Sequence, residues 1–292
     1  MELVIKVPGS CGELVQGTLN GEPFLVTCPI DRYTTVRISD SLSGCYGLKS
    51  KASQALLYTL ARFKCKKMPF GISLESELPI GKGMASSSAD IAAVMLGVSA
   101  ALGKCFTAEE VLAQAAAIDP TDGVFCKDIV SLNYLTGKIL TKYSYVPPLK
   151  IAIFDSGGEV NTEAFHARAD LAKLNAANEG YILRAINLLA AGMRSGDEVK
   201  IAKAATYSAK VNQNIIYKEH LADLWQITKD CGALGVNVAH SGTVAGVLWS
   251  SKTDEKYIKQ AVSKVSKALS NWQFAGLAKL ISGGFTIRRS DE

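Results

Sequence analysis

The chain has 292 residues, a length that can bury one large hydrophobic core or two modest ones. Hydrophobic residues make up 48% of the chain and charged residues 20%, as is ordinary for a globular protein. The net charge of +5 is spread along the chain without a Lys/Arg run or an interleaved aromatic patch, so it suits an anionic ligand and argues against nucleic acid as a partner.

The seven cysteines are odd in number and widely spaced, and no Cys-x-x-Cys pair occurs among them. This pattern argues against a disulfide framework and against a structural zinc site. The N-terminus lacks the layout of a signal peptide, and the longest apolar run, residues 91–102, is too short to span a bilayer. We therefore expect a cytoplasmic protein without a membrane partner.

The first predicted elements are a strand over residues 3–7 and a bent, glycine-rich segment over residues 8–17. In the bent segment, glycines such as Gly12 let the backbone pass close to a neighbour. Glu13 is the only charged residue there. It has two interpretations: a solvated side chain in a turn, or a carboxylate that the loop directs into a pocket.

Residues 24–28 and 33–38 predict two further strands, because both are rich in β-branched and aromatic residues. In the connection between them, Asp31 and Arg32 either pair with each other, which is the simpler interpretation, or line a substrate site. The periodicity of residues 51–63 predicts a helix that packs on a sheet.

Residues 79–90 are a run of small residues between a predicted strand, 70–78, and a predicted buried helix, 91–102. The first turn of such a helix presents unpaired N–H groups and the positive end of the helix dipole. Because the glycines let backbone approach a ligand, this segment predicts a site for an anion, most often phosphate. The simpler alternative is a well-capped core helix with a flexible entry loop.

Two common nucleotide-binding motifs do not fit this segment. It is not a Walker A loop, because no Gly-Lys-Ser/Thr follows four residues after a glycine. It also falls short of the dinucleotide fingerprint, because Ser86 occupies the place of the third glycine after Gly81 and Gly83.

The next predicted helix, residues 111–118, follows a capping box that begins at Thr107. It ends before residues 119–125, where Asp119 and Asp122 lie three residues apart in a turn that contains proline and glycine. Asp-Pro and Asp-Gly are common turn pairs. The alternative is that this rigid turn holds carboxylates that do chemistry.

A stiff Val-Pro-Pro link at residues 146–148 predicts a boundary between a domain of residues 1–148 and a domain of residues 149–292. Small residues in the segment 240–248 predict a turn that lets backbone approach a ligand. In the second domain, strand patterns occupy residues 150–155, 234–239 and 285–288. Helical patterns occupy residues 162–173, 180–191, 197–212, 220–231 and 254–269, and Thr162 caps the first of these helices.

Residues 79–88 resemble the second motif of the GHMP kinases (galactokinase, homoserine kinase, mevalonate kinase and phosphomevalonate kinase), whose pattern is Pro-x-Gly-x-Gly-Leu-Gly-Ser-Ser-Ala. Here Met84, Ala85 and Ser88 replace a leucine, a glycine and an alanine. Two further motifs of the family fall in the same order along the chain.

Residues 8–17 resemble the first motif, a Pro-Gly/Ala-led loop that helps to form the substrate site, although Ser10 stands where many members carry Lys or Arg. Asp122, in Pro-Thr-Asp-Gly-Val, matches the catalytic aspartate of the family. Asp119 is the nearest acidic candidate for the metal-binding residue that usually precedes it. Residues 239–246 match the glycine-rich third motif in part.

The chain is also similar to one branch of the family, the L-threonine kinases of cobalamin biosynthesis. The runs that carry this similarity are residues 10–17, 28–31, 83–93, 120–123 and 239–243. The resemblance implies an α+β fold with an N-terminal domain like the second domain of ribosomal protein S5 and a ferredoxin-like C-terminal domain. ATP and Mg²⁺ are the implied cofactors, and the implied reaction phosphorylates the hydroxyl of free L-threonine for assembly of the cobalamin nucleotide loop.

The resemblance also implies roles for individual residues. Asp122 accepts or orients the hydroxyl proton, and Ser87 and Asp119 hold the metal. The residues implied for ATP binding are Pro79, Gly81, Lys82, Gly83, Met84, Ala85, Ser86, Ser87 and Ser88. The residues predicted to lie at the substrate are Gly12, Glu13, Asp31 and Thr243, and a contact from Arg32 or Thr162 is a weaker prediction.

Three alternatives stay open from the sequence. Homoserine kinase belongs to the same class and differs in where the substrate carries its hydroxyl. A non-catalytic S5-like nucleotide-binding protein would keep the loop without the chemistry, and an S5-like nucleic-acid-binding module would need more clustered charge. The sequence leaves the oligomeric state open, with a homodimer as one alternative.

Overall fold

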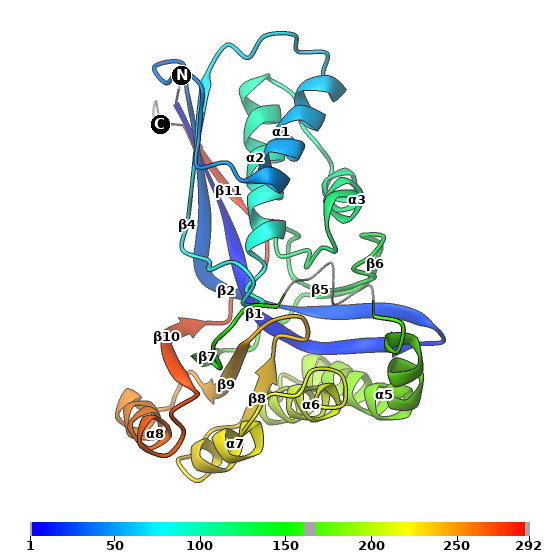
Figure 1. Ribbon diagram of the computed structural model, residues 1–292, viewed down its shortest axis with the longest axis vertical. Coiled ribbons are helices and arrows are strands. Elements are labelled where there is room, and N and C mark those ends of the chain that lie inside the picture. Colours follow the sequence, from blue (N-terminus) through cyan, green and yellow to red (C-terminus); the bar gives the residue numbers. More distant parts are fainter. Residues whose placement is uncertain (1, 161–167, 290–292) are drawn as a thin grey trace.

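The computed structural model describes residues 2–160 and 168–289 (Figure 1). The strands are β1 (Glu2–Leu19), β2 (Glu22–Ser39), β3 (Cys45–Tyr46), β4 (Gly71–Ser76), β5 (Ile129–Leu132), β6 (Ile139–Tyr143), β7 (Leu149–Asp155), β8 (Gly235–Val238), β9 (Val244–Ser250), β10 (Gln273–Lys279) and β11 (Thr286–Arg289). The helices are α1 (Ser50–Arg62), α2 (Ser86–Ala101), α3 (Ala108–Ile118), α5 (Leu171–Ser195), α6 (Glu198–Asn212), α7 (Leu221–Lys229) and α8 (Glu255–Ala268).

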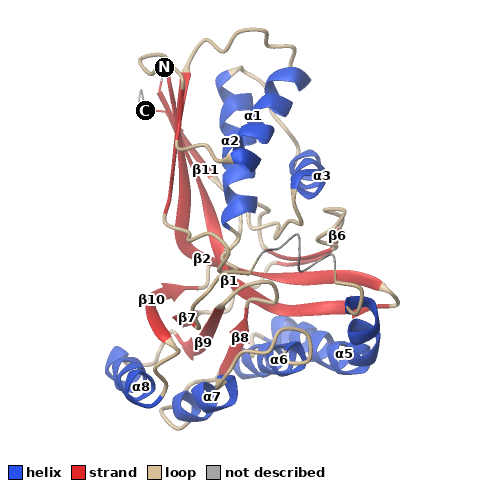
Figure 2. Ribbon diagram, viewed as in Figure 1, coloured by secondary structure: helices blue, strands red, loops and turns tan. Residues whose placement is uncertain are grey.

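The described strands form one 11-stranded sheet, whose main path runs β10-β7-β9-β8-β1-β2-β4-β3. The long antiparallel hairpin of β1 and β2 connects its two parts (Figure 2). Helices α1, α2 and α3 lie against the part that contains β4 and β11, whereas α5 to α8 lie beneath the part that contains β7 to β10. Strand β1 pairs with β8 through Glu13 and Val238. Glu13 therefore lies where the two parts of the sheet meet.

The strand predicted over residues 3–7 continues to Leu19, so the prediction that residues 8–17 form a separate bend is wrong. The pairing with β2 is interrupted by register shifts before Gly9 and on both sides of Glu13. Gly12, with φ of 54°, takes a conformation that other residues rarely adopt. The glycines therefore produce bulges inside one strand.

Two other predicted boundaries are also wrong. The strands predicted at residues 24–28 and 33–38 are one strand, because the connection between them stays paired with β1. The helix predicted at residues 180–191 belongs to the longer helix α5, which begins at Leu171. Residues 162–167 of the first predicted helix, with Thr162, lie outside the described residues. Strands β3, β5 and β10 were not predicted.

Helix α2 is the core of the N-terminal part, since it is buried from Ser88 to Ser99. It is apolar on all sides, as expected for a helix that other elements surround. Figure 1 shows α2 between α1, α3 and the sheet, with its first turn toward the middle of the molecule. Among the described residues, no helix is long and apolar enough to cross a membrane.

Candidate active site

Three segments far apart in the sequence meet through their backbones. The N–H of Ser10 donates to the carbonyl of Met84 over 3.0 Å, and the N–H of Gly12 donates to the carbonyl of Gly83 over 3.1 Å. The N–H of Thr243 donates to the carbonyl of Lys82 over 3.0 Å. The bulged strand β1, the loop before α2 and the turn before β9 are the segments that carry the three motif resemblances.

Two glycines permit this close packing. A Cβ atom on Gly83, where φ is 80°, would lie 2.1 Å from the Cβ of Ala239. A Cβ atom on Gly12 would lie 2.4 Å from the backbone of Val238. Any other residue would therefore push the three segments apart.

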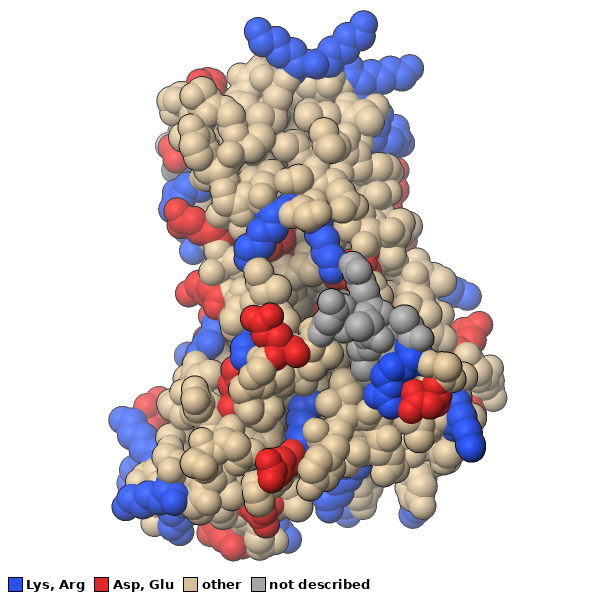
Figure 3. Space-filling model, in the orientation of Figure 1, with Lys and Arg blue, Asp and Glu red and all other residues tan. Residues whose placement is uncertain are grey.

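A cavity of about 550 Å³ opens beside these segments. The predicted site residues that line it are Glu13, Gly81, Gly83, Met84, Ala85, Ser86, Ser87, Ser88, Asp119 and Asp122. It is also lined by residues that were not predicted, including Gln16, Lys51, Tyr134, Glu159 and Ser241. The surface view shows Lys and Arg side chains interspersed with Asp and Glu over this face of the molecule (Figure 3).

Pro79, Gly12, Lys82, Thr243 and Asp31 are predicted site residues that do not line this cavity. The ammonium of Lys82 lies 2.8 Å from Oδ2 of Asp155, and the hydroxyl of Thr243 donates to Oδ1 of Asp155 over 2.6 Å. Burial would raise the pKa of Asp155, but these hydrogen bonds and that of the Gly157 N–H hold it below its ordinary value. Lys82 and Thr243 thus tie the loop and the turn to the end of β7.

Asp31 lies elsewhere. Its carboxylate is exposed and accepts a hydrogen bond from the N–H of Lys279 over 2.7 Å. The guanidinium of Arg32 donates to the carbonyl of Ala275 over 2.8 Å, also in β10. The geometry leaves the substrate role predicted for Asp31, and that considered for Arg32, without structural support.

Helix α2 begins without a side-chain cap. Its N-cap residue is Ala85, which has the left-handed conformation and makes no side-chain cap hydrogen bond. By contrast, α3 begins with the predicted capping box of Thr107 and Glu110. The well-capped core helix considered for residues 79–90 is therefore not what the structure contains. The first-turn N–H groups of α2 remain available to an anion at the cavity wall.

Two neighbouring serines differ in their partners. Ser88 Oγ accepts the N–H of Asp122 over 3.0 Å, so this serine holds the turn that carries Asp122. Ser87 Oγ is buried and has no hydrogen-bond partner in residues 2–160 and 168–289. A buried hydroxyl without a partner fits a ligand that supplies one.

The oxygens at this wall suit Mg²⁺, which usually binds through one or two protein oxygens together with substrate phosphates. Ser87 and Asp119 line the same cavity. No group of three or more His, Cys, Asp or Glu residues among the described residues is arranged to hold a metal. One hydroxyl and one carboxylate are a donor set that fits a metal arriving with a phosphate ligand.

The carboxylates of Glu13, Asp119 and Asp122 influence one another electrostatically, and all three residues line the cavity. Burial, followed by the negative charges of Glu13 and Asp119, raises the pKa of Asp122 well above its ordinary value, and the hydrogen bond with Ser88 opposes the rise. Lys51 Nζ lies 2.8 Å from Oδ2 of Asp119 and supplies a positive charge. Asp122 is thus a carboxylate with a strengthened affinity for a proton.

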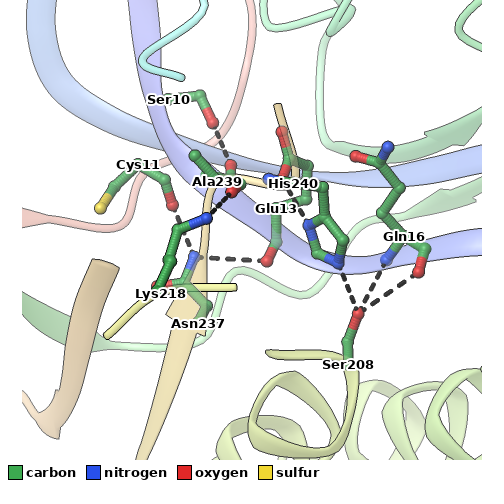
Figure 4. A network of polar contacts seen from close by, with 10 residues as sticks. Ser10, Cys11, Glu13, Gln16, Ser208, Lys218, Asn237, Ala239 and His240 are labelled. Carbon is green, nitrogen blue, oxygen red and sulfur yellow. Dashed lines mark hydrogen bonds and ion pairs between the residues drawn. The ribbon is translucent and has the colours of Figure 1, made fainter. Parts of the chain in front are cut away.

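The carboxylate of Glu13 is hydrogen-bonded to a buried histidine, His240 (Figure 4). Its Oε2 accepts hydrogen bonds from the N–H of His240 over 3.0 Å and from Nδ1 of His240 over 2.7 Å. The other ring nitrogen lies 3.0 Å from the hydroxyl of Ser208 on α6. Because a carboxylate only accepts, Nδ1 of His240 carries a hydrogen. Sequence pattern alone assigned His240 no partner.

A buried cation lies near this pair. Lys218 Nζ donates to the carbonyl of Ala239 over 2.8 Å. Burial lowers the pKa of Lys218 to about 8, against the opposing effect of the negative charge of Glu13. The side-chain amide of Asn237 donates to the carbonyls of Cys11 and Glu13 and fixes the bulge of β1.

Known proteins resemble this chain in sequence and in fold. Residues 50–127 match the model of the GHMP kinases N terminal domain. This segment of the chain is therefore similar to the N-terminal domain of the GHMP kinases. The fold of the whole chain is that of homoserine kinase from Cytophaga hutchinsonii, with a TM-score of 0.72 and 16% identity over 98% of this chain and 97% of that chain. Mevalonate kinase from Methanococcus jannaschii has the same fold, with a TM-score of 0.71 and 14% identity over 95% of this chain and 98% of that chain.

Two curated relatives match nearly the full length of the chain. The L-threonine kinase of Salmonella typhimurium is 27% identical over 289 residues, which cover 98% of this chain and 95% of the relative. The L-threonine kinase of Citrobacter freundii is 29% identical over 289 residues, which cover 98% of this chain and 99% of the relative. The predicted family and the predicted α+β class are confirmed, whereas the division into domains at residue 148 stays a prediction.

Proposed function

We propose that this GHMP kinase transfers the γ-phosphoryl group of ATP to the side-chain hydroxyl of free L-threonine and forms O-phospho-L-threonine. The observation that carries the proposal is that Ser87, Asp122 and Glu13 line one cavity at the uncapped start of α2. The near full-length similarity to two L-threonine kinases supports the choice of substrate.

The ATP phosphates bind at the start of α2, where N–H groups point to the cavity. Positioning and charge neutralisation account for most of the rate in phosphoryl transfer, because the protein does little covalent chemistry. Ser87 and Asp119 are the residues that would hold Mg²⁺. When bound, the metal neutralises charge that develops on the phosphates. Lys51 adds a positive charge beside Asp119.

Asp122 acts as the general base. A hydroxyl is a poor nucleophile at neutral pH, and a base within ~2.6–3.2 Å of it contributes on the order of 10²–10⁴-fold. The neighbouring carboxylates and burial raise the pKa of Asp122, so its ionised form is a stronger base than a solvated aspartate. The hydrogen bond between the Asp122 N–H and Ser88 fixes the turn on which the carboxylate lies.

Glu13 binds the ammonium group of the substrate. The residue is 4% exposed and lines the cavity, and a carboxylate in such a buried place is a strong partner for a cation. Gly12 and Thr243 do not line the cavity, so we assign them to positioning the segments around it. The proposed entry of the product into cobalamin nucleotide-loop assembly is supported by motif resemblance alone.

The test measures ADP release by the purified protein with Mg·ATP and L-threonine, L-homoserine or L-serine as acceptor. We expect the highest kcat/KM with L-threonine. Preference for L-homoserine would keep the kinase chemistry and overturn the substrate. ATP binding without turnover on any of the three amino acids would overturn the proposed function.

A further inference from the structure

A second, much smaller cavity adjoins the first. Its volume is about 20 Å³, and Gln16 and Tyr134 line both cavities. The small cavity is also lined by Asn175, Asn212 and His240. His240 is the residue that holds Glu13, so the small cavity lies next to the proposed position of the substrate ammonium group.

Asn212 carries a buried amide without a partner. The residue is 2% exposed, and neither its Nδ2 nor its Oδ1 has a hydrogen-bond partner among the residues that the structure describes. Nearly all buried polar groups in proteins are hydrogen-bonded, so an amide without such a partner at a cavity wall fits a ligand that supplies one. Asn178, a buried asparagine on the neighbouring helix, shows the usual situation, since it donates to Val211 and accepts from Asn214.

Asn212 lies on the face of α6 that is directed to Glu13, the residue proposed to bind the substrate. It follows Ser208 by one helical turn, so both residues lie on the same face of α6. Ser208 contacts His240 and the backbone of Gln16 (Figure 4). The face of α6 that carries Asn212 therefore packs against the strand that carries Glu13.

The chemistry of an amino-acid substrate matches this arrangement. The ammonium and carboxylate of an α-amino acid are attached to the same carbon, so the carboxylate must lie within a few ångströms of the group that binds the ammonium. Amide N–H groups donate to carboxylates. The buried ammonium of Lys218 donates to the carbonyl of Ala239, the residue before His240, and adds positive charge there.

We infer that Asn212, together with Asn175, forms the subsite for the α-carboxylate of the amino-acid substrate, beside Glu13 and His240. This inference rests on the proposed function. A cavity of about 20 Å³ holds a single water molecule, which would pair with Asn212 without any role in substrate binding. A carboxylate reaches Asn212 only if the side chains that line the small cavity move apart. The experiment separates these two occupants.

The test compares Asn212→Leu with the matched control Asn178→Leu, since both substitutions remove a buried amide and keep the branching of the side chain. Thermal unfolding without ligand and steady-state kinetics are measured for both variants. Acceptors are L-threonine and L-threoninamide, in which a neutral amide replaces the carboxylate. Asn212→Asp, which sets a negative charge against the carboxylate, is a second variant in case the leucine does not fit.

We expect wild type to prefer L-threonine over L-threoninamide by at least tenfold in kcat/KM, as for loss of a charge-assisted hydrogen bond. Asn212→Leu should raise the KM for L-threonine by about tenfold and remove this preference, without lowering the melting temperature. Asn178→Leu should lower the melting temperature and keep the preference. Unchanged KM and preference in Asn212→Leu or Asn212→Asp would overturn the subsite, whereas absence of threonine turnover in wild type would overturn the proposed function instead.

Discussion

Nδ1 of His240 lies 2.7 Å from Oε2 of Glu13, and the main-chain N–H of His240 donates to the same oxygen. Within the part of the chain that the structure describes, no hydrogen bond ends on the other oxygen, Oε1. One oxygen of Glu13 is thus held by a turn 227 residues away, and the other is left for the cavity.

We predict that His240→Leu weakens threonine binding, because a freed carboxylate loses its orientation. The KM for L-threonine should rise about tenfold, as for loss of a charge-assisted hydrogen bond, with a smaller change in the KM for ATP. His240→Asn keeps an N–H donor near the position of Nδ1 and should recover part of the affinity. Equal KM values for wild type and His240→Leu would show that Glu13 needs no such support.

Asp122→Asn should separate activity from stability. Loss of the base lowers kcat on the order of 10²–10⁴-fold. Because the folded protein raises the pKa of Asp122, ionised Asp122 lowers the stability of the fold at neutral pH. The neutral variant should therefore melt at a higher temperature than wild type.

This stabilisation has a defined pH dependence. The gain in stability of Asp122→Asn over wild type is fully present above the raised pKa of Asp122 in the folded protein. The gain disappears as the pH falls toward the ordinary aspartate pKa of ~3.9, because Asp122 of wild type then becomes protonated, and so neutral, in the unfolded chain too. Melting curves across this range provide the measurement. A lower melting temperature for Asp122→Asn at neutral pH would contradict the like-charge account of this site.

Ser87→Ala removes the buried hydroxyl that has no partner. The ligand-free protein should be as stable as wild type or more stable, since an unpaired buried hydroxyl costs about 1–3 kcal/mol. The Mg²⁺ concentration for half-maximal activity should rise several-fold if this oxygen binds the metal. The control is Ser88→Ala, which removes the acceptor of the Asp122 N–H and should destabilise the fold by about 1 kcal/mol. An unchanged Mg²⁺ requirement in Ser87→Ala would remove Ser87 from the metal site.

Gly83→Ala should disrupt the contact between the loop before α2 and the turn before β9. The added Cβ atom meets Ala239 at 2.1 Å and the backbone has φ of 80°, so strain and a clash combine. Gly21→Ala is the matched control, because φ there is 76° and nothing lies within 4 Å of the added atom. The control should lose about 1–2 kcal/mol in the free energy of unfolding, from left-handed strain alone. Gly83→Ala should lose more and should also bind ATP more weakly, and an equal loss in both variants would show that the contact with Ala239 is unimportant.

Local signals in the sequence predicted local features well. The capping box at Thr107 and the helix at residues 51–63 depend on neighbouring residues, and both are present. The glycines of residues 8–17 were misread as a bend, because a bulge inside a long strand uses the same residue type as a turn. Gly180 is an exposed position inside α5 with no neighbour within 4 Å of a Cβ atom, so the helix passes through it at a cost of only about 1 kcal/mol.

The candidate site was predicted where a motif carries it and missed where the fold assembles it. Ser87, Asp122 and Glu13 came from motif resemblance, and the structure brings them to one cavity. The partnership of His240 with Glu13 and the unpaired amide of Asn212 depend on contacts between distant segments, for which one sequence contains no periodic signal. Asp31 is the opposite case. It was predicted to lie at the substrate, but its carboxylate is hydrogen-bonded to Lys279 of β10 and it does not line the cavity.

The most direct test of the proposed phosphoryl transfer is the proton-coupled phosphorus NMR spectrum of the product formed from ATP and L-threonine. Phosphorus on the threonine hydroxyl couples to the single proton on the adjacent carbon, so transfer to this hydroxyl should give a doublet for a new phosphate ester. The doublet should be absent, or should form far more slowly, with Asp122→Asn. Release of inorganic phosphate alone, or a product signal without coupling to that proton, would contradict transfer to the threonine hydroxyl.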